Sequence, residues 1–121
     1  MGCVEPFAGS SAVDMTTHAA GTIAVIFVSQ ESGEDLTGYA AAAAEMNALA
    51  AEQPGYRGMD SSRGGDGLGI TVSYWADDAS AVAWRDNARH AAIREAGRGI
   101  WYAWYSLHVA TVTRSYDWQK S

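Results

Sequence analysis

The pattern of apolar and polar positions along the first half of the chain predicts a strand followed by a helix. Residues 22–29 are β-branched or apolar with almost no polar alternation, which is typical of a strand covered on both faces. Residues 36–52 are dominated by alanine and predict a helix. The run Gln53-Pro54-Gly55 would end this helix, because proline disfavours helical geometry in the residue before it and glycine permits a tight reversal.

A hairpin is predicted next. Residues from about 56 to 63 form a candidate strand, and over residues 68–75 apolar side chains alternate with small or polar ones. The Gly-Gly-Asp-Gly run at 64–67 lies between them and is a turn signal. These two strands should therefore be antiparallel neighbours.

The last third of the chain predicts a second helix and a final strand. Asp77 can cap a helix that apolar positions at helical spacing extend to Ala96, where Gly97 and Gly99 would stop it. Residues 105–116 alternate between two faces and predict a long strand. The predicted order is βαββαβ.

This order fits an α+β fold, a ferredoxin-like sandwich in which an antiparallel four-stranded sheet carries both helices on one face. The other sheet face would be bare. Because the first strand is apolar on both faces, we expect two copies to stack through these bare faces as a homodimer. We assign residues 21–118 to this domain, residues 1–20 to a mobile N-terminal extension and residues 119–121 to a tail.

Composition narrows the classes of partner. The 121 residues suit one domain, and a formal net charge of −6 disfavours binding to nucleic acid. No segment approaches the roughly 18 consecutive apolar residues of a membrane span, and no signal peptide is visible. The single cysteine, Cys3, cannot form an intramolecular disulfide, so the expected location is cytoplasmic.

The order of elements and several short motifs resemble the antibiotic biosynthesis monooxygenase superfamily over about residues 22–118. The motifs that carry the resemblance are Gln53-Pro-Gly-Tyr-Arg57, Gly69-Ile-Thr-Val-Ser-Tyr-Trp75, Ala83-Trp-Arg85, Arg89-His90, Gly97-Arg-Gly-Ile-Trp-Tyr102, Val109-Ala-Thr-Val-Thr-Arg114 and Tyr116. The resemblance implies a small dimeric α+β barrel. It also implies one of three functional classes: oxygenases that turn phenols or anthrones into quinones without a cofactor, haem-degrading enzymes, and members without established activity.

Two tryptophans match positions near the substrate in that superfamily. Trp75 matches the tryptophan of the quinone-forming branch, whose oxyanion-stabilising asparagine is replaced here by Thr71. Trp84 matches a second tryptophan that lies close to haem in the haem-degrading branch. The axial histidine of that branch corresponds to Arg94 here, and His90 comes about one helical turn sooner.

His90 is the candidate base. A neutral imidazole can take a phenolic proton, and the resulting anion can transfer an electron to dioxygen. Asp86, four residues earlier on the same predicted helix, would orient the ring, while Tyr74 or Tyr102 would donate a hydroxyl to the developing oxyanion. The alternative is that His90 is a partly solvated helix residue making a local hydrogen bond.

The other candidates also have a structural interpretation. Trp75 and Trp84 are large enough to be core residues, yet an indole also offers a flat wall and one N–H donor to an aromatic ligand. Arg98 and Arg114 could bind an anion or form plain surface ion pairs. Trp104 suits a dimer interface. The predicted catalytic residues are His90, Trp75 and Tyr74, and the predicted substrate-binding residues are Trp84, Thr71, Asp86, Tyr102 and Arg98.

Three functions remain open from the sequence. The first is a cofactor-independent monooxygenase that oxidises a small aromatic or polyketide-like substrate with dioxygen. The second is a haem-binding, or haem-degrading, protein with His90 as axial ligand. The third is a non-catalytic dimeric interaction module. The three histidines show no spacing comparable to a metal site, so no metal is predicted.

Overall fold

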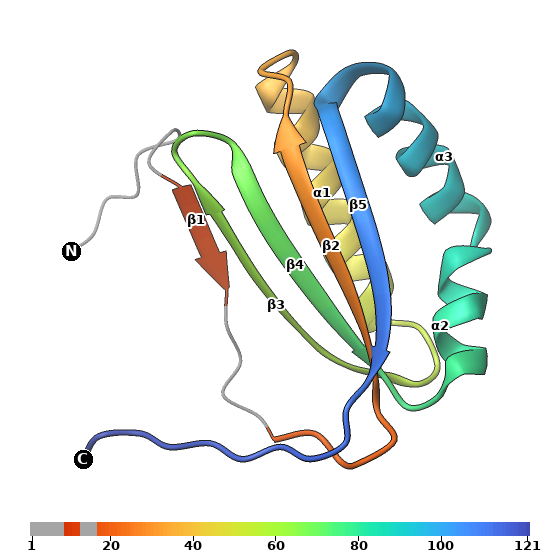
Figure 1. The fold of residues 1–121 in the computed structure, drawn as a ribbon. Coiled ribbons are helices and arrows are strands. Elements are labelled where there is room, and N and C mark those ends of the chain that lie inside the picture. The colour runs from red at the N-terminus through yellow and green to blue at the C-terminus, as the bar shows by residue number, and fades with distance from the viewer. Residues whose placement is uncertain (1–8, 13–16) are drawn as a thin grey trace.

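The computed structural model describes residues 9–12 and 17–121 and shows one antiparallel sheet with helices against it (Figure 1). The elements in chain order are β1 (Gly9–Ala12), β2 (Ile23–Glu31), α1 (Leu36–Ala51), β3 (Tyr56–Gly64), β4 (Leu68–Trp75), α2 (Asp78–Arg85), α3 (Ala88–Ala96), the π-helical turn η1 (Gly97–Trp101) and β5 (Tyr102–Thr111).

The strand order is β1-β3-β4-β2-β5, and every neighbouring pair is antiparallel. Four of these strands are the predicted sheet, and β3 and β4 are the predicted hairpin, so the ferredoxin-like α+β fold is confirmed. The short strand β1 is an addition that the sequence pattern did not predict; it pairs with β3, with Gly9 opposite Gly64. Of the predicted extension, residues 1–8 and 13–16, including Cys3, lie outside the described residues.

The expected single helix from Asp77 to Ala96 is wrong: the structure divides it into α2 and α3. Asn87 makes the break. Its backbone is non-helical, and its side-chain oxygen accepts hydrogen bonds from the backbone N–H groups of Arg89 at 3.0 Å and His90 at 3.1 Å. Asparagine is a strong N-cap because this oxygen satisfies amides that the first helical turn leaves unpaired. The cap therefore starts a new helix inside the apolar pattern.

Gly97 does not stop the second helical segment as expected. The chain continues from α3 through the π-helical turn η1 to Trp101. A Cβ atom on Gly97 would lie 2.8 Å from Cε2 of Tyr102, so this glycine permits a close approach of the turn to the start of β5. Its role is in packing rather than in ending the helix.

The last strand lies earlier than the expected 105–116, because its partner β2 sets its limits. Glu31 at the end of β2 pairs with Tyr102, and Ile23 at its start pairs with Thr111. Beyond that point only Val112 continues the pairing, exchanging backbone hydrogen bonds with Gly21 and Thr22. β5 therefore ends opposite the first residue of β2.

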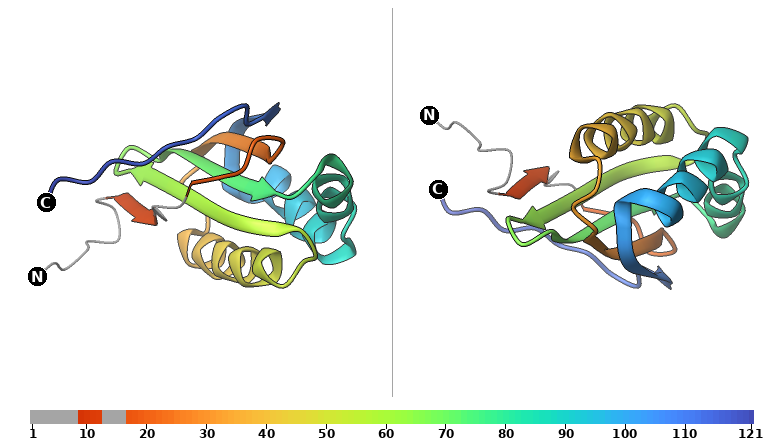
Figure 2. Two further views of the ribbon diagram at one scale, coloured as in Figure 1. Left: turned by 90° about the horizontal axis from the view of Figure 1, so that it is seen from below. Right: turned by 90° about the horizontal axis from the view of Figure 1, so that it is seen from above.

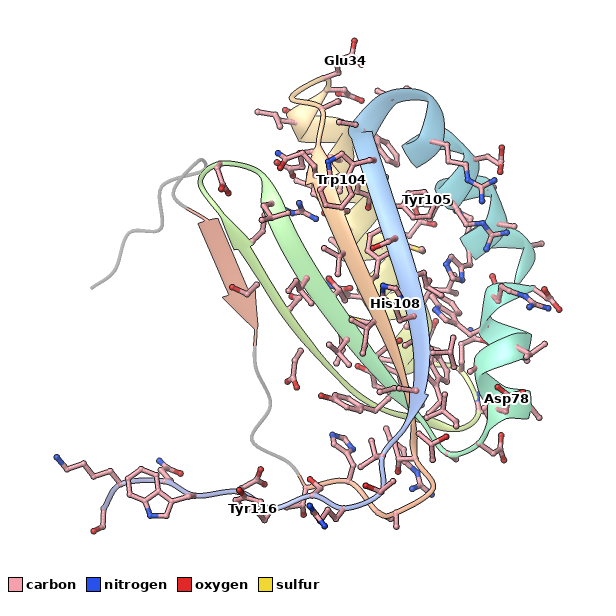
Figure 3. All side chains as sticks on the ribbon, in the orientation of Figure 1. Glu34, Asp78, Trp104, Tyr105, His108 and Tyr116 are labelled. Atoms are coloured by element: carbon pink, nitrogen blue, oxygen red, sulfur yellow. The ribbon has the colours of Figure 1, made fainter. Side chains whose placement is uncertain are left out.

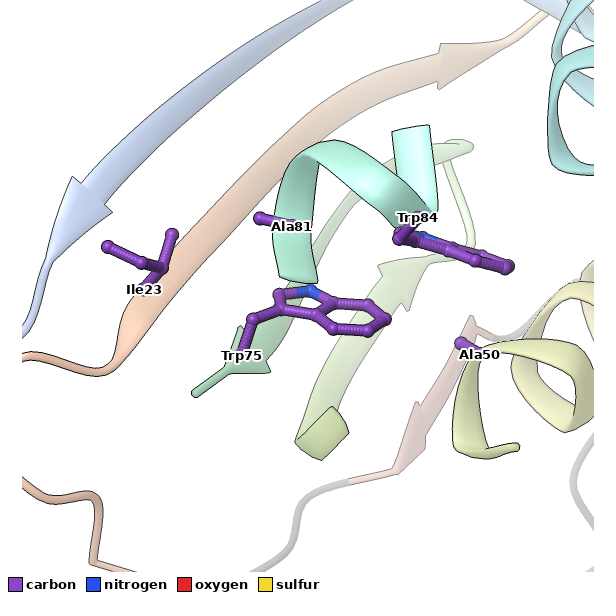
Figure 4. Close-up of a cluster of buried hydrophobic side chains, with 5 residues drawn as sticks. All are labelled: Ile23, Ala50, Trp75, Ala81 and Trp84. Carbon is purple, nitrogen blue, oxygen red and sulfur yellow. The ribbon is translucent and has the colours of Figure 1, made fainter. Parts of the chain in front are cut away.

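The core lies between the sheet and the helices (Figures 2 and 4). It consists of Ile23, Ala50, Trp75, Ala81 and Trp84, contributed by two strands and two helices. Trp75 is fully buried, and its indole N–H donates to the Ser73 hydroxyl at 2.9 Å. Burying an indole with its N–H satisfied is strongly favourable, so this tryptophan anchors α2 to the sheet.

The opposite sheet face is open and carries several large apolar side chains. Strand alternation places Leu68, Ile70 and Trp104 on this face, with 43%, 48% and 50% of their surfaces exposed. Figure 3 shows Trp104 and Tyr105 projecting from opposite sides of β5. The bare face expected from the sequence is therefore present in the chain.

Candidate active site at the junction of α2 and α3

Three of the predicted site residues form one continuous stack. The His90 ring lies on the Trp84 indole with centroids 4.2 Å apart and an interplanar angle of 27°. Trp84 in turn lies on Trp75, with centroids 5.8 Å apart and an angle of 23°. The stack runs from the first turn of α3 into the core. Trp84 is 7% exposed and Trp75 is 0% exposed, so both also have the structural role that the sequence left open.

His90 is held by a backbone carbonyl. Its Nδ1 atom lies 2.7 Å from the carbonyl oxygen of Trp84. Because a carbonyl oxygen can only accept, Nδ1 carries the proton, and in the neutral ring Nε2 keeps a lone pair. Partial burial lowers the pKa of His90, the Trp84 carbonyl acts in the opposite direction, and the charge of Arg94 lowers it further. The neutral ring, which can accept a proton, is therefore favoured.

The expected role of Asp86 as the group that orients His90 is wrong. Asp86 caps the end of α2 rather than sharing a helix with His90. Its carboxylate is exposed and binds Arg85, with Arg85 Nε 3.0 Å from Oδ1, and this hydrogen bond lowers the pKa of Asp86. The break at Asn87 turns α3 away from the geometry on which that prediction rested. The carbonyl of Trp84 takes the orienting role instead.

Tyr74 is not brought together with His90. It alternates with Trp75 along β4 and so lies on the open face of the sheet, opposite the helices. Its hydroxyl donates to Oδ2 of Asp60 at 3.0 Å, and its ring stacks on His18 at 3.8 Å. Burial and the Asp60 carboxylate raise the pKa of Tyr74. A hydroxyl donor for a site beside His90 must come from elsewhere.

Thr71 lies on the helix-covered face, because it is two residues from Ser73 and four from Trp75 on β4. It pairs with Phe27 on β2 and Ser61 on β3. The hydroxyl of Thr71 thus occupies the middle of the sheet on the side of the His90 stack. Thr71 and Trp75 thus lie on the same face of the sheet, and Tyr74 lies on the opposite face.

Tyr102 belongs to an aromatic group at the other end of the helix-covered face. Its ring meets those of Phe27, Tyr39 and Tyr105, with centroids 5.4, 5.8 and 6.0 Å apart. Burial raises the pKa of Tyr102 well above its usual range, and Tyr39 adds to the effect. The phenol therefore stays protonated and remains a hydrogen-bond donor.

The two cations singled out from the sequence are not poised at the His90 stack. Arg98 is exposed and is engaged by Glu95 at 2.6 Å and by the Tyr105 hydroxyl at 2.6 Å, which matches the surface ion-pair alternative. Arg114 lies in the exposed segment after β5. Neither side chain has a contact with His90 among the described residues.

Two other arginines have environments that the sequence analysis did not identify. Arg63 is mostly buried and is fully engaged within the fold, donating to the Ser29 hydroxyl at 2.7 Å and to the Tyr39 hydroxyl at 3.0 Å. Arg94 donates from Nη1 to the Arg85 carbonyl at 3.2 Å, while its Nε atom is buried without a partner. The surroundings of both side chains depend on tertiary packing, so spacing along the chain gave no signal for them.

Two hollows open on the helical side of the molecule. One, of about 260 Å³, lies between the end of α1 and α2, where Pro54, Ser80 and Trp84 line it. The other, of about 270 Å³, lies between α1 and α3 and includes Ala42, Ile93 and Trp101. Trp84 connects the first hollow to the stack, although His90 lines neither hollow.

No group of three or more His, Cys, Asp or Glu side chains that could hold a metal occurs within residues 9–12 and 17–121. None of the helices in that part of the chain is long and apolar enough to cross a membrane. The Nε2 atom of His90 has the chemistry of either a base or an axial ligand.

Comparison with known proteins identifies the family of this chain. The family model for antibiotic biosynthesis monooxygenases matches residues 22–96. The uncharacterized protein YqjZ of Bacillus subtilis (strain 168) is 46% identical over 98 residues, which cover 81% of this chain and 85% of YqjZ.

Two solved structures show the same fold. A mutant of SnoaB from Streptomyces nogalater, a cofactor-independent oxygenase, has a TM-score of 0.68 at 15% identity, covering 78% of this chain and 96% of its own. A protein from Bacteriodes thetaiotaomicron assigned to antibiotic biosynthesis monooxygenases has a TM-score of 0.69 at 14% identity, covering 83% and 97%. With the matched model, these similarities show that the chain belongs to the antibiotic biosynthesis monooxygenase family.

Proposed function

We propose that the protein is a cofactor-independent monooxygenase that oxidises a small aromatic or polyketide-like molecule with dioxygen, using His90 as the base. The observation that carries the proposal is the fixed tautomer of His90. The Trp84 carbonyl holds the proton on Nδ1, and partial burial keeps the ring neutral, so Nε2 is a ready acceptor. Family membership and the fold shared with SnoaB support this class of reaction.

The chemistry needs one base and no metal or flavin. His90 Nε2 takes a proton from an acidic C–H or O–H of the substrate, and the electron pair stays on the substrate as a phenolate or stabilised carbanion. That anion transfers one electron to dioxygen, and the substrate radical and superoxide recombine to a peroxide. When a CH₂ group is oxidised in this way, one oxygen atom becomes the new carbonyl. The other oxygen leaves as water with the two hydrogens of the CH₂ group.

The aromatic residues have different parts in this proposal. Trp84 would supply a wall for the substrate, because it both lines a hollow and supports the His90 ring. Trp75 would hold Trp84 in place from below, since it is fully buried and its N–H is engaged by Ser73. Tyr102, held protonated by its burial, lies at the other end of the helix-covered face and would contact a part of the substrate distant from His90.

We also propose a homodimer through the open sheet face, forming an α+β barrel. The exposed Leu68, Ile70 and Trp104 side chains on that face support it, because contiguous apolar surface of this kind marks an interface. The expected cytoplasmic location remains a prediction.

The direct test is oxygen consumption with anthrone-type substrates. We expect wild-type protein to convert an anthrone to the corresponding quinone faster than buffer does. The His90→Ala variant should lose the acceleration, typically by a factor of about 10² to 10⁴ for loss of a general base. His108→Ala is the matched control, because His108 lies in the middle of β5, where its register partner Ile26 belongs to the open face. Absence of turnover, or equal turnover in His90→Ala, contradicts the proposal.

Haem binding through His90 has less support. The fold shared with SnoaB, a cofactor-independent oxygenase, favours chemistry without haem. A haemin titration separates the alternatives: a Soret shift that His90→Ala removes would replace the oxygenase proposal with haem binding. If there is neither turnover nor a Soret shift, the non-catalytic interaction module becomes the favoured function.

A further inference from the structure

Residues 112–121 form an arm that leaves the end of β5 and runs past the sheet as an extended segment (Figure 1). The arm exposes 85% of Tyr116 and 76% of Trp118, more than any other large hydrophobic side chain in the described part of the chain. Two aromatic rings so close together form a contiguous apolar patch, and such patches on soluble proteins mark interaction sites. The arm therefore calls for a surface to pack against.

One side of the arm faces its own chain. The Ser115 hydroxyl accepts a hydrogen bond from the backbone N–H of His18 at 3.2 Å, so the Ser115 side chain points toward the chain to which it belongs. Side chains alternate between the two sides of an extended segment, which places Tyr116 and Trp118 on the side opposite Ser115. The aromatic side of the arm thus faces outward, and these two rings do not cover the open sheet face of their own chain.

The arm and the open sheet face lie on the same side of the molecule. Both views of Figure 2 show the arm on the side of the sheet opposite α1. The open face carries the exposed Leu68, Ile70 and Trp104 side chains on that same side. From Ser115 to Ser121 an extended chain spans roughly 20 Å, which is about the width of four strands spaced about 4.8 Å apart. The arm is therefore long enough to cross an open face of this size.

Charge distinguishes the possible partners of the arm. The arm carries Arg114 and Lys120 with Asp117 between them, which gives it a net charge of +1. The whole chain carries −6, so residues 1–111 carry −7. A basic arm is attracted to an acidic protein surface, whereas an anionic lipid surface would repel residues 1–111. A second copy of this chain offers both an acidic surface and an apolar open face.

We propose that the arm packs Tyr116 and Trp118 against the open sheet face of a second copy of this chain, while the arm of that copy packs in the same way in return. This inference rests on the proposed homodimer and adds an interaction surface to it. In a two-fold symmetric pair each contact occurs twice, so one arrangement covers both arms and both open faces. The two rings expose on the order of 300 Å² per chain, about a third of the roughly 800 Å² that each partner buries in a standard interface.

Sedimentation equilibrium measures the contribution of the arm. The double variant Tyr116→Ser/Trp118→Ser should raise the dimer Kd about ten- to a hundredfold, because tyrosine and tryptophan commonly supply much of the affinity of an interface. Thr113→Ser/Gln119→Ser is the matched control, since it changes the opposite side of the same arm, and it should keep the wild-type Kd. Both double variants should keep the wild-type circular dichroism spectrum, because all four side chains are exposed. An unchanged Kd in the aromatic double variant overturns the inference.

Photocrosslinking shows which chain the arm touches. Trp118 is replaced by p-benzoylphenylalanine in unlabelled protein, which is then mixed with an excess of ¹⁵N-labelled wild-type chains. Irradiation should join position 118 to ¹⁵N-labelled peptides from β2, β4 or β5, whose alternate side chains form the open face. Crosslinks confined to unlabelled peptides would place the arm on its own chain and overturn the inference.

The outcomes separate the arm from the rest of the proposed function. If Ile70→Lys gives a monomer while the aromatic double variant keeps the wild-type Kd, the sheet-face dimer stands and the role of the arm falls. If the wild-type protein is monomeric at micromolar concentration, both interfaces fall, and anthrone oxidation still tests the oxygenase by itself. If the wild-type protein co-sediments with phosphatidylglycerol vesicles and the aromatic double variant does not, the arm binds lipid and the inference is overturned.

Discussion

His90 and Trp84 are joined by a hydrogen bond that crosses the junction of α2 and α3, with His90 Nδ1 2.7 Å from the Trp84 carbonyl oxygen. The same two residues stack through their rings. Position and tautomer of the imidazole are thus set by one residue, and the helix break brings the two together. The proposed chemistry depends on this junction more than on any carboxylate.

Asn87 should control both the stability and the reactivity of the junction. Replacing Asn87 by Ala removes the acceptor for the first amides of α3, so the free energy of unfolding should fall by about 1 kcal/mol. The His90 ring should also lose its fixed orientation, and turnover should fall more than stability explains. Urea unfolding and oxygen uptake measure the two effects. Asn87→Asp keeps the acceptor and should stay close to wild type; equal losses in both variants would contradict the cap.

Turnover and stability should both depend on the titration of His90. Because burial lowers the pKa of His90 in the folded protein, the ring should stay neutral to a lower pH than an exposed histidine, whose pKa is about 6.5. The rate should fall only as the pH drops through this lowered pKa. Between the two pKa values the unfolded chain binds more protons, so stability should decrease as the pH falls from about 6.5. His90→Gln should flatten this part of the stability profile, and an unchanged profile would contradict the assignment.

Ser73 and Trp75 should be energetically coupled. Ser73→Ala leaves the buried indole N–H without an acceptor and should destabilise the fold by about 1–3 kcal/mol. In a Trp75→Phe background there is no N–H to satisfy, so the same Ser73→Ala change should cost close to nothing. A double-mutant cycle by urea unfolding measures the difference. Equal costs in both backgrounds would show that the hydrogen bond does not contribute to stability.

The open sheet face should form the dimer interface. Ile70→Lys places a charge in the centre of this face and should convert the protein to a monomer in analytical ultracentrifugation at micromolar concentration. Ile100→Lys is the control, since Ile100 is similarly exposed, at 42%, but lies in η1. Identical sedimentation of the wild-type protein and the Ile70→Lys variant would contradict the proposed interface.

Sheet and helix order were predictable from the sequence, because strands with a covered face alternate with period two and the hairpin glycines stand at 64–67. The break at Asn87 was not predictable from the sequence, because the apolar spacing continues across it. A capping residue inside a helical pattern is hard to distinguish from a polar surface residue. The orientation of His90 depends on that break, so it was not predictable either. The predicted role of Asp86 requires it to share a helix face with His90 on an unbroken helix, whereas the structure has two separate helices.

The roles of the arginines were the least predictable feature. Arg98 has neighbours within the turn that engage it, while the isolation of Arg94 Nε depends on packing between elements. Burial of a guanidinium is decided by contacts distant in sequence, as between Arg63 and Ser29. The positions of the cations along the chain therefore do not show which of them the fold buries or pairs.

The missing side chain at Gly97 lets the turn η1 lie directly against the Tyr102 ring. With only 2.8 Å between the place of a Cβ atom and the Tyr102 ring, a single methyl group would act as a wedge between the turn and β5. Alanine at position 97 would therefore require η1 and the Tyr102 ring to move apart, which would disturb the contacts of Tyr102 with Phe27 and Tyr39.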